Sequence, residues 1–304
     1  MLLLQQMIVL FIYMMIGYAA CKKGNLDEMA SSKLSWIVLN VANPMLVISA
    51  AVNGDGTIQG TELLLTAGIA VLMFGIFMIL AMILPKILKV NEGDVPFYKL
   101  MTVFNNMAFM GFPVISAVYG SNALLYASVF IFPFNILIYT YGIQVVDQKN
   151  SGKFDWKKVC NLGVLSCVVA GVLYLMKIPV PQFVKSVSQG LGNLNGPLSM
   201  MVTGIALAKI RICNLFTDVK LLVFAMIKLL VIPILGTLLL KQFISNETLC
   251  GVAMIIMATP VASMTMMLAK ENCDNCETIV KGISLTTLLS VVTIPLVSAI
   301  VGAL

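Results

Sequence analysis

The sequence predicts an all-α membrane protein whose ten transmembrane helices form two inverted five-helix repeats, with helices 4 and 9 broken. Three observations lead to this fold class. The composition is strongly apolar throughout, the basic residues alternate between successive loops, and proline-containing breaks recur at matching positions in the two halves.

The composition places the chain in a lipid bilayer. Of its 304 residues 60% are hydrophobic and 11% are charged, and the mean hydropathy is +1.01. Apolar windows recur along the whole length, so no soluble domain is expected. The net charge of +6 follows from basic loops and does not indicate a nucleic-acid partner.

Ten apolar segments have roughly the length of about 20 residues that a spanning helix needs. They cover approximately 2–21, 34–54, 63–85, 98–119, 123–146, 159–176, 186–208, 219–240, 248–269 and 282–303. The chain is therefore divided into a first repeat (1–147), a short cytoplasmic linker (148–157) and a second repeat (158–304). Lys22 and Lys23 follow the first apolar segment, so we expect that segment to remain as a span and not to be a cleaved signal peptide.

Basic residues separate the two sets of alternate loops. One set carries only Lys177, Lys185 and Lys241, whereas fifteen of the nineteen Lys and Arg residues belong to the other set. Basic residues favour the cytoplasmic side of short loops. The sequence thus predicts a multi-pass protein of the cell (inner) membrane with both termini outside.

The cysteines give no sign of a metal or redox centre. Cys273 and Cys276 form a Cys-x-x-Cys pair, but the chain contains no histidine and no second such pair lies nearby. Structural zinc needs four ligands. We therefore predict no metal, no cofactor and no enzymatic activity.

Prolines suggest the internal repeat. Asn43-Pro44 in the second span precedes Pro113 in the fourth by 69 residues, and Pro197 in the seventh precedes Pro260 in the ninth by 63. Interrupted spans at corresponding places in two halves are typical of inverted-repeat transporters, whose site lies where the repeats meet.

The stretch from Asn105 to Pro113 is unusual for a lipid-embedded helix. It contains two adjacent amides and a Gly-x-Pro, in an interval without charge between Lys99 and Asp147. Proline lacks a backbone donor, so the helix is predicted to be kinked or interrupted at Pro113. The half-helices after Pro113 and Pro260 would then both begin near the membrane midplane, where their N-termini favour an anion.

The candidate site residues are neutral, and no Asp, Glu or His lies centrally in any span. They are Asn105, Asn106, Gly111, Pro113, Thr259, Pro260, Ser263, Asn43, Asn135, Asn195 and Tyr139. Amides, hydroxyls and helix N-termini suit a carboxylate substrate, whereas a proton or cation carrier would normally hold an ionisable group here. For Asn43, Asn135 and Asn195, bonding between helices is an equally good interpretation.

Lys228 is the one charge well inside a span, about 12 Å deep at 1.5 Å per residue. Snorkelling to the cytoplasmic surface is slightly favoured over the alternative, in which the ammonium group faces a cavity and attracts anions.

These motifs resemble the auxin efflux carriers along the whole chain. Asn106-Met-Ala-Phe-Met-Gly-Phe-Pro113 looks like their Asn-x-x-x-Met-Gly-x-Pro, Leu268-Ala-Lys-Glu271 is similar to the plant Phe-Ala-Lys-Glu, and Pro44 stands where their second span has a proline. The resemblance implies five-plus-five inverted repeats with helices 4 and 9 crossing, and a transport part that moves like an elevator against a scaffold. By the same resemblance Asn106 binds the substrate carboxylate, and Pro113 and Pro260 form the crossing. The short linker resembles the prokaryotic branch, often described as malate or malonate permeases.

We therefore predict a secondary transporter that moves a small organic anion by alternating access. A carrier of a neutral or zwitterionic substrate such as an amino acid is the first alternative, and an intramembrane sensor is a second of a different class. The expected partners are the substrate and membrane lipid. A homodimer and coupling to Na⁺ or H⁺ are left open.

Overall fold

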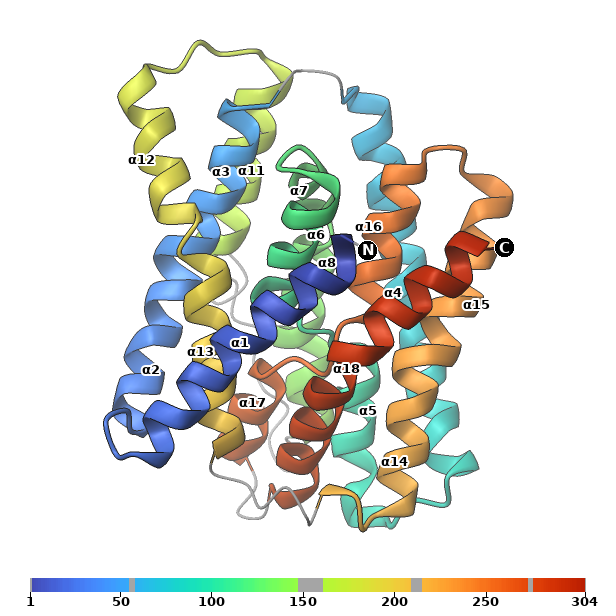
Figure 1. The fold of residues 1–304 in the computed structure, drawn as a ribbon. Coiled ribbons are helices and arrows are strands. Elements are labelled where there is room, and N and C mark those ends of the chain that lie inside the picture. The colour runs from blue at the N-terminus through green and yellow to red at the C-terminus, as the bar shows by residue number, and fades with distance from the viewer. Residues whose placement is uncertain (1, 55–57, 147–160, 209–214, 273–275, 304) are drawn as a thin grey trace.

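The structure is a computed structural model that describes residues 2–54, 58–146, 161–208, 215–272 and 276–303. Within these ranges the elements are helices, and the only extended pairing is an isolated β-bridge between Asn105 and Val261. Figure 1 shows a helical bundle in which α1 (Leu2–Lys22) and α18 (Glu277–Ala303) run obliquely across the front.

After α1, the first half of the chain contains the long helix α4 and a series of shorter helices and helical turns. The elements are α2 (Glu28–Ile37), η1 (Val38–Ala42), α3 (Asn43–Val52), α4 (Gly60–Ile87), η2 (Glu92–Asp94), α5 (Val95–Val103), η3 (Met107–Gly111), α6 (Phe112–Tyr119), α7 (Ala123–Val129), α8 (Ile131–Leu137), η4 (Ile138–Gly142) and α9 (Ile143–Val146). The predicted linker 148–157 lies outside the described residues.

The second half resumes after that gap. Its elements are α11 (Leu162–Leu175), α12 (Gln182–Gly192), α13 (Asn195–Ala208), α14 (Val219–Met226), η6 (Ile227–Val231), α15 (Ile232–Phe243), α16 (Glu247–Ala258) and α17 (Met264–Asn272), followed by α18.

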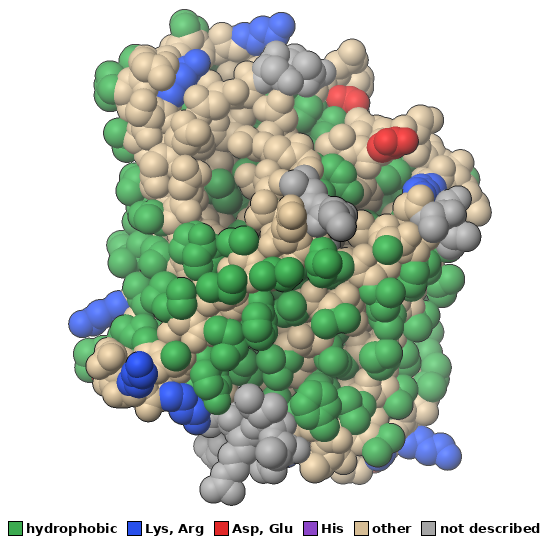
Figure 2. Space-filling view, viewed as in Figure 1, with side chains coloured by type: hydrophobic (Ala, Val, Ile, Leu, Met, Phe, Trp, Pro, Cys, Tyr) green, Lys and Arg blue, Asp and Glu red, His purple; other side chains and the backbone are tan. Residues whose placement is uncertain are grey.

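Six helical stretches of the described chain are long and apolar enough to cross a membrane. They are Leu4–Lys22, Glu28–Val52, Gly60–Ile87, Ala123–Val146, Val219–Phe243 and Glu277–Gly302, with shorter apolar helices at Met107–Tyr119, Leu162–Leu175 and Glu247–Ala258. Figure 2 shows hydrophobic side chains gathered in a band across the middle, with lysine or arginine side chains above and below it. The fold is that of a multi-pass membrane protein, as predicted.

The helices pack in two groups. In one group α1 packs on α13, and α3 packs on α11 and α12. In the other α4 packs on α5, α15 on α16, and α18 on α14 and α16. The first group lies to the left in Figure 1 and the second to the right.

Glycines allow the closest approach in the first group. A side chain at Gly17 of α1 would collide with the Met201 backbone of α13, and one at Gly204 of α13 would collide with the Met14 backbone of α1. Small residues at a contact let two membrane helices meet backbone to backbone.

The fourth predicted span (98–119) is broken, but the predicted position of the break, Pro113, is wrong. The helical path stops after Val103 and resumes at Met107, whereas Pro113 lies in the first turn of α6. Pro113 lies inside the continuous helical stretch Met107–Tyr119, and the carbonyl of Phe109, four residues before it, accepts from the Ser199 hydroxyl in place of the N–H that proline lacks. The wide turn η3 precedes it and ends with an i→i−5 bond from the Phe112 N–H to the Met107 carbonyl.

The same arrangement explains Pro44. The π-helical turn η1 leads directly into α3, whose first turn contains Pro44, so the second span continues through its proline without interruption. By contrast, Pro260 stands inside a non-helical segment between α16 and α17, as predicted.

Candidate substrate site

The two broken spans meet through their backbones. The Asn106 N–H donates to the Pro260 carbonyl at 2.8 Å, and the Ala262 N–H donates to the Phe104 carbonyl at 3.0 Å. These bonds satisfy backbone groups that have no partner within a helix because the helices are broken. Non-helical backbone is tolerated at membrane depth only when its polar groups are satisfied in this way. We call the two segments, 104–106 and 259–263, the crossing.

Asn105 ties the crossing together with its side chain. Its amide nitrogen donates to the Ile256 carbonyl of α16 at 2.7 Å, and its amide oxygen accepts from the Lys228 ammonium at 2.6 Å. The side chain is buried. Asn105 therefore bonds to two different helices of the second half.

Lys228 is buried in the bundle, so the snorkelling interpretation is wrong. Its ammonium group donates to the Thr102 carbonyl at 3.1 Å as well as to Asn105, and lies 5.7 Å from the centre of the Phe77 ring. The residue is 2% exposed. Its described partners are the uncharged oxygens of Thr102 and Asn105, and no carboxylate of the described chain pairs with it.

Asn106 differs from its neighbour because its side chain has no hydrogen bond recorded among the described residues. Its backbone is fully used: the N–H pairs with Pro260, and the carbonyl accepts from the N–H groups of Met110 at 3.2 Å and Gly111 at 3.1 Å. The residue is buried. A buried amide with spare donors and acceptors is the kind of group that can bind a ligand.

Thr259 and Gly111 form a contact between the segment 259–263 and the turn η3 that follows 104–106. The Thr259 hydroxyl donates to the Ile256 carbonyl of its own helix at 2.7 Å, and its methyl group lies 3.4 Å from where a Gly111 side chain would begin. Val261 is bonded to α18, because its N–H donates to the Thr286 hydroxyl at 3.2 Å.

Helix α13 contacts the turn after the first break. The Ser199 hydroxyl donates to the Phe109 carbonyl at 2.7 Å, and the Asn195 amide approaches the Ala108 carbonyl at 3.4 Å. The amide oxygen of Asn195 is buried without a partner in the described structure. Pro113 lies beside Gly196 of this helix.

Of the remaining predicted residues, Ser263 belongs to the crossing itself, and Asn135 and Asn43 make no hydrogen bond to it within the described chain. Asn135 donates to the Ile131 carbonyl at 2.9 Å and accepts from Asn161 at 2.6 Å, which supports the interhelical interpretation. Asn43 is buried at the start of α3 and its amide oxygen has no described partner. Ser263 is partly exposed just before α17, and Tyr139 lies on η4.

This geometry, with two broken helices paired through their backbones around buried amides, is accompanied by a match to a known family. Residues 2–155 and 148–298 match the profile described as "membrane transport protein". The chain belongs to this membrane transport family. The match confirms the resemblance to auxin efflux carriers drawn from the sequence.

A relative supports the same assignment. An "Uncharacterized transporter" of Methanothermobacter thermautotrophicus is 22% identical over 295 residues, which is 95% of each chain. As a member of the membrane transport family, the protein is a transporter whose spans cross the membrane several times.

Sequence reasoning singled out Lys228 but slightly favoured the wrong interpretation of it, and it missed Thr286. Lys228 could have been recognised because Pro233, five residues later, predicts a wide turn that rotates the helix, and η6 occupies that place. Thr286 gave no signal, because a threonine in a span usually bonds to its own helix, as Thr286 also does to the Gly282 carbonyl at 2.7 Å.

Proposed function

We propose that the protein is a secondary transporter of a small organic anion, a carboxylate, which binds at the crossing. The observation that carries the proposal is the buried Lys228 ammonium group, whose described partners are the neutral oxygens of Thr102 and Asn105. A buried lysine amine without a counter-ion is costly to protonate, and the approach of an anion makes its charged form favourable.

Two further features support an anion. The helical segments after both breaks begin at the crossing, with Met107 and Met264 as their first residues. Their dipoles favour negative charge, while the N–H groups of Met107, Thr265 and Met266 already bond to the carbonyls of Asn105, Ala262 and Ser263. The unbonded Asn106 amide could donate to a carboxylate oxygen.

A zwitterionic substrate such as an amino acid is the second candidate. The unpaired amide oxygens of Asn43 and Asn195 are buried acceptors, which would suit an ammonium group. A neutral substrate or an intramembrane sensor has no such observation in its favour.

The pairs of packed helices support the proposed inverted repeat of residues 1–147 and 158–304. Span 1 packs on span 7 as α1 on α13, and its counterpart, span 6 on span 2, is α11 on α3. Span 3 packs on span 4 as α4 on α5, and span 8 on span 9 as α15 on α16. An exchange of the two halves leaves this set of contacts unchanged.

Alternating access follows if the two helix groups slide against each other. Asn105, Asn106 and Thr259 are all buried in this conformation, so substrate entry requires movement. We propose that the group containing the crossing moves as an elevator against the group built on α1 and α13. The bias of basic residues supports an orientation with both termini outside.

Transport by the purified protein in liposomes tests the proposal. Dicarboxylates, aromatic carboxylates and amino acids are offered in turn, and Lys228→Met is compared with Lys220→Met, which removes an exposed lysine of the adjoining α14. We expect Lys228→Met to lower anion uptake on the order of 10- to 100-fold, the value of one charge-assisted contact, and Lys220→Met to change it little. Unchanged anion uptake in a well-folded Lys228→Met protein contradicts the proposal. Uptake confined to amino acids favours the second candidate.

A further inference from the structure

A basic pocket lies away from the crossing, where α4 turns through η2 into α5. Its volume is about 500 Å³, and its lining consists of Met82, Pro85, Lys86, Lys89, Val90, Val95 and Lys99. Three of these seven residues are lysines and none is acidic. The proposed transport of substrate at the crossing makes no use of this pocket.

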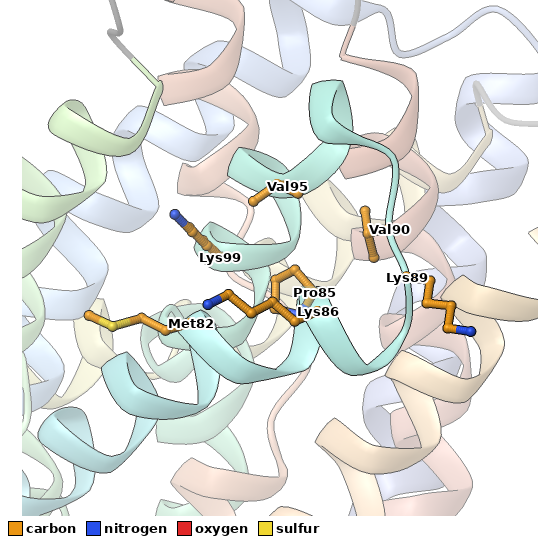
Figure 3. A pocket seen from close by; sticks show the side chains of 7 residues that line it. All are labelled: Met82, Pro85, Lys86, Lys89, Val90, Val95 and Lys99. Atoms are coloured by element: carbon orange, nitrogen blue, oxygen red, sulfur yellow. The ribbon is translucent and has the colours of Figure 1, made fainter.

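The lysines are available to a ligand. Lys86 and Lys99 come from different helices, and Figure 3 shows their amines on the same side of the pocket as Met82, with Lys89 extending to the other side. Within the described chain, neither the Lys86 nor the Lys99 ammonium group has a recorded acceptor or ion pair. Two unpaired cations facing one pocket favour an anionic group between them.

The apolar part of the pocket continues along the membrane face of α4. Met82 is exposed, and Ile76, Ile79 and Ile83, spaced three and four residues apart, are exposed on the same helix. Such a stripe on a spanning helix faces acyl chains. The pocket therefore joins a site for negative charge to a surface for hydrocarbon at the edge of a spanning helix.

We infer that this pocket binds an acidic phospholipid of the surrounding bilayer. Its phosphate would lie between Lys86 and Lys99, and one acyl chain would follow Met82 along α4. Basic pockets next to spanning helices recognise anionic headgroups in this way. The apolar stripe favours the lipid over a free phosphate, which could use only the lysines.

Thermal melting of the detergent-purified protein with added phosphatidylglycerol, phosphatidylcholine or glycerol phosphate tests this inference. Phosphatidylglycerol should raise the melting temperature of the parent in a saturable manner, while the other two should not. In Lys86→Gln/Lys99→Gln the apparent affinity for phosphatidylglycerol should fall roughly 10- to 30-fold, since each lysine near an anionic surface contributes on the order of a fivefold factor.

Two control variants distinguish binding in the pocket from general electrostatic attraction between the lipid and the lysines of the protein. Lys23→Gln/Lys33→Gln removes two exposed lysines elsewhere with the same change in charge, and should leave the affinity within about twofold. Lys86→Arg/Lys99→Arg keeps the charge and should keep most of the affinity. An equal loss of affinity in Lys23→Gln/Lys33→Gln would show that the lipid does not bind specifically in this pocket. Equal stabilisation by glycerol phosphate would show that the ligand of the pocket is not the lipid.

Discussion

The two segments of the crossing, 104–106 (the first arm) and 259–263 (the second arm), both interrupt a helix, but different residues cause the interruption. In the first arm the helix stops at Val103 without a proline, and the next proline along the chain, Pro113, lies inside the helical stretch that follows. In the second arm Pro260 lies in the break itself, and its carbonyl accepts the Asn106 N–H. The break at Pro260 follows from the local sequence. The break at 104–106 depends on tertiary contacts with distant residues.

The difference shows where each arm obtains its stability. Pro260 cannot donate a backbone bond, so a helix through residue 260 would lose one wherever it packed. The first arm is held by side chains: Asn105 bonds to Ile256 and to Lys228. The first arm should therefore be the more sensitive to side-chain removal and the second the more sensitive to a change of backbone.

The largest effect on stability is expected from Asn105→Leu. It leaves the Lys228 ammonium with one acceptor fewer and the Ile256 carbonyl without this donor, in a region that excludes water. Loss of two buried bonds, one of them to a charge, should lower the free energy of unfolding by about 2–4 kcal/mol. Thermal melting in detergent measures it.

Thr259→Val is the matched change in the second arm. Its hydroxyl bonds only within its own helix, so about 1 kcal/mol or less is expected. Asn105→Leu/Lys228→Met should recover part of the loss, because the buried charge is then gone. Equal destabilisation by Asn105→Leu and Thr259→Val would show that the arms are not held in the different ways described.

The sequence was informative where a signal was local. The apolar segments and the break at Pro260 follow from composition and from proline chemistry. The break at 104–106 could not be located, because nothing in Phe104-Asn105-Asn106 forbids a helix. Its extended form depends on pairing with Val261, more than 150 residues away in the chain. The partner of Lys228 was hidden for the same reason.

Asn106 should affect binding more than stability, in contrast to Asn105 beside it. Its side chain has no recorded partner in the described chain, so Asn106→Ala should change the free energy of unfolding by less than about 1 kcal/mol. If it donates to a substrate carboxylate, affinity should fall on the order of 10- to 100-fold. Thermal melting of the purified variant measures its stability, and titration with the transported anion measures its affinity.

The charge variant sharpens this comparison. Asn106→Asp should be worse than Asn106→Ala for an anion, since it places like charges together, whereas a cationic substrate would tolerate it. An Asn106→Asp protein that melts normally and moves an organic anion at the parental rate would remove Asn106 from the site.

The smallest effect that still separates the two arms is expected from their prolines. Pro260→Ala lets the second break become more helical and gives residue 260 a donor, so the extended segment that accepts the Asn106 N–H is less strongly favoured. Neighbouring groups can satisfy the released backbone, so stability should change modestly. Transport should slow roughly 10-fold, equivalent to about 1.4 kcal/mol on the barrier. Pro113→Ala is the matched control, because Pro113 lies inside the helical stretch that begins with η3, where alanine also fits the helix. Initial uptake rates in liposomes, normalised to folded protein, should therefore show Pro113→Ala within about twofold of the parent. If the two prolines prove interchangeable in this assay, the break at Pro260 is not where the sequence controls the movement.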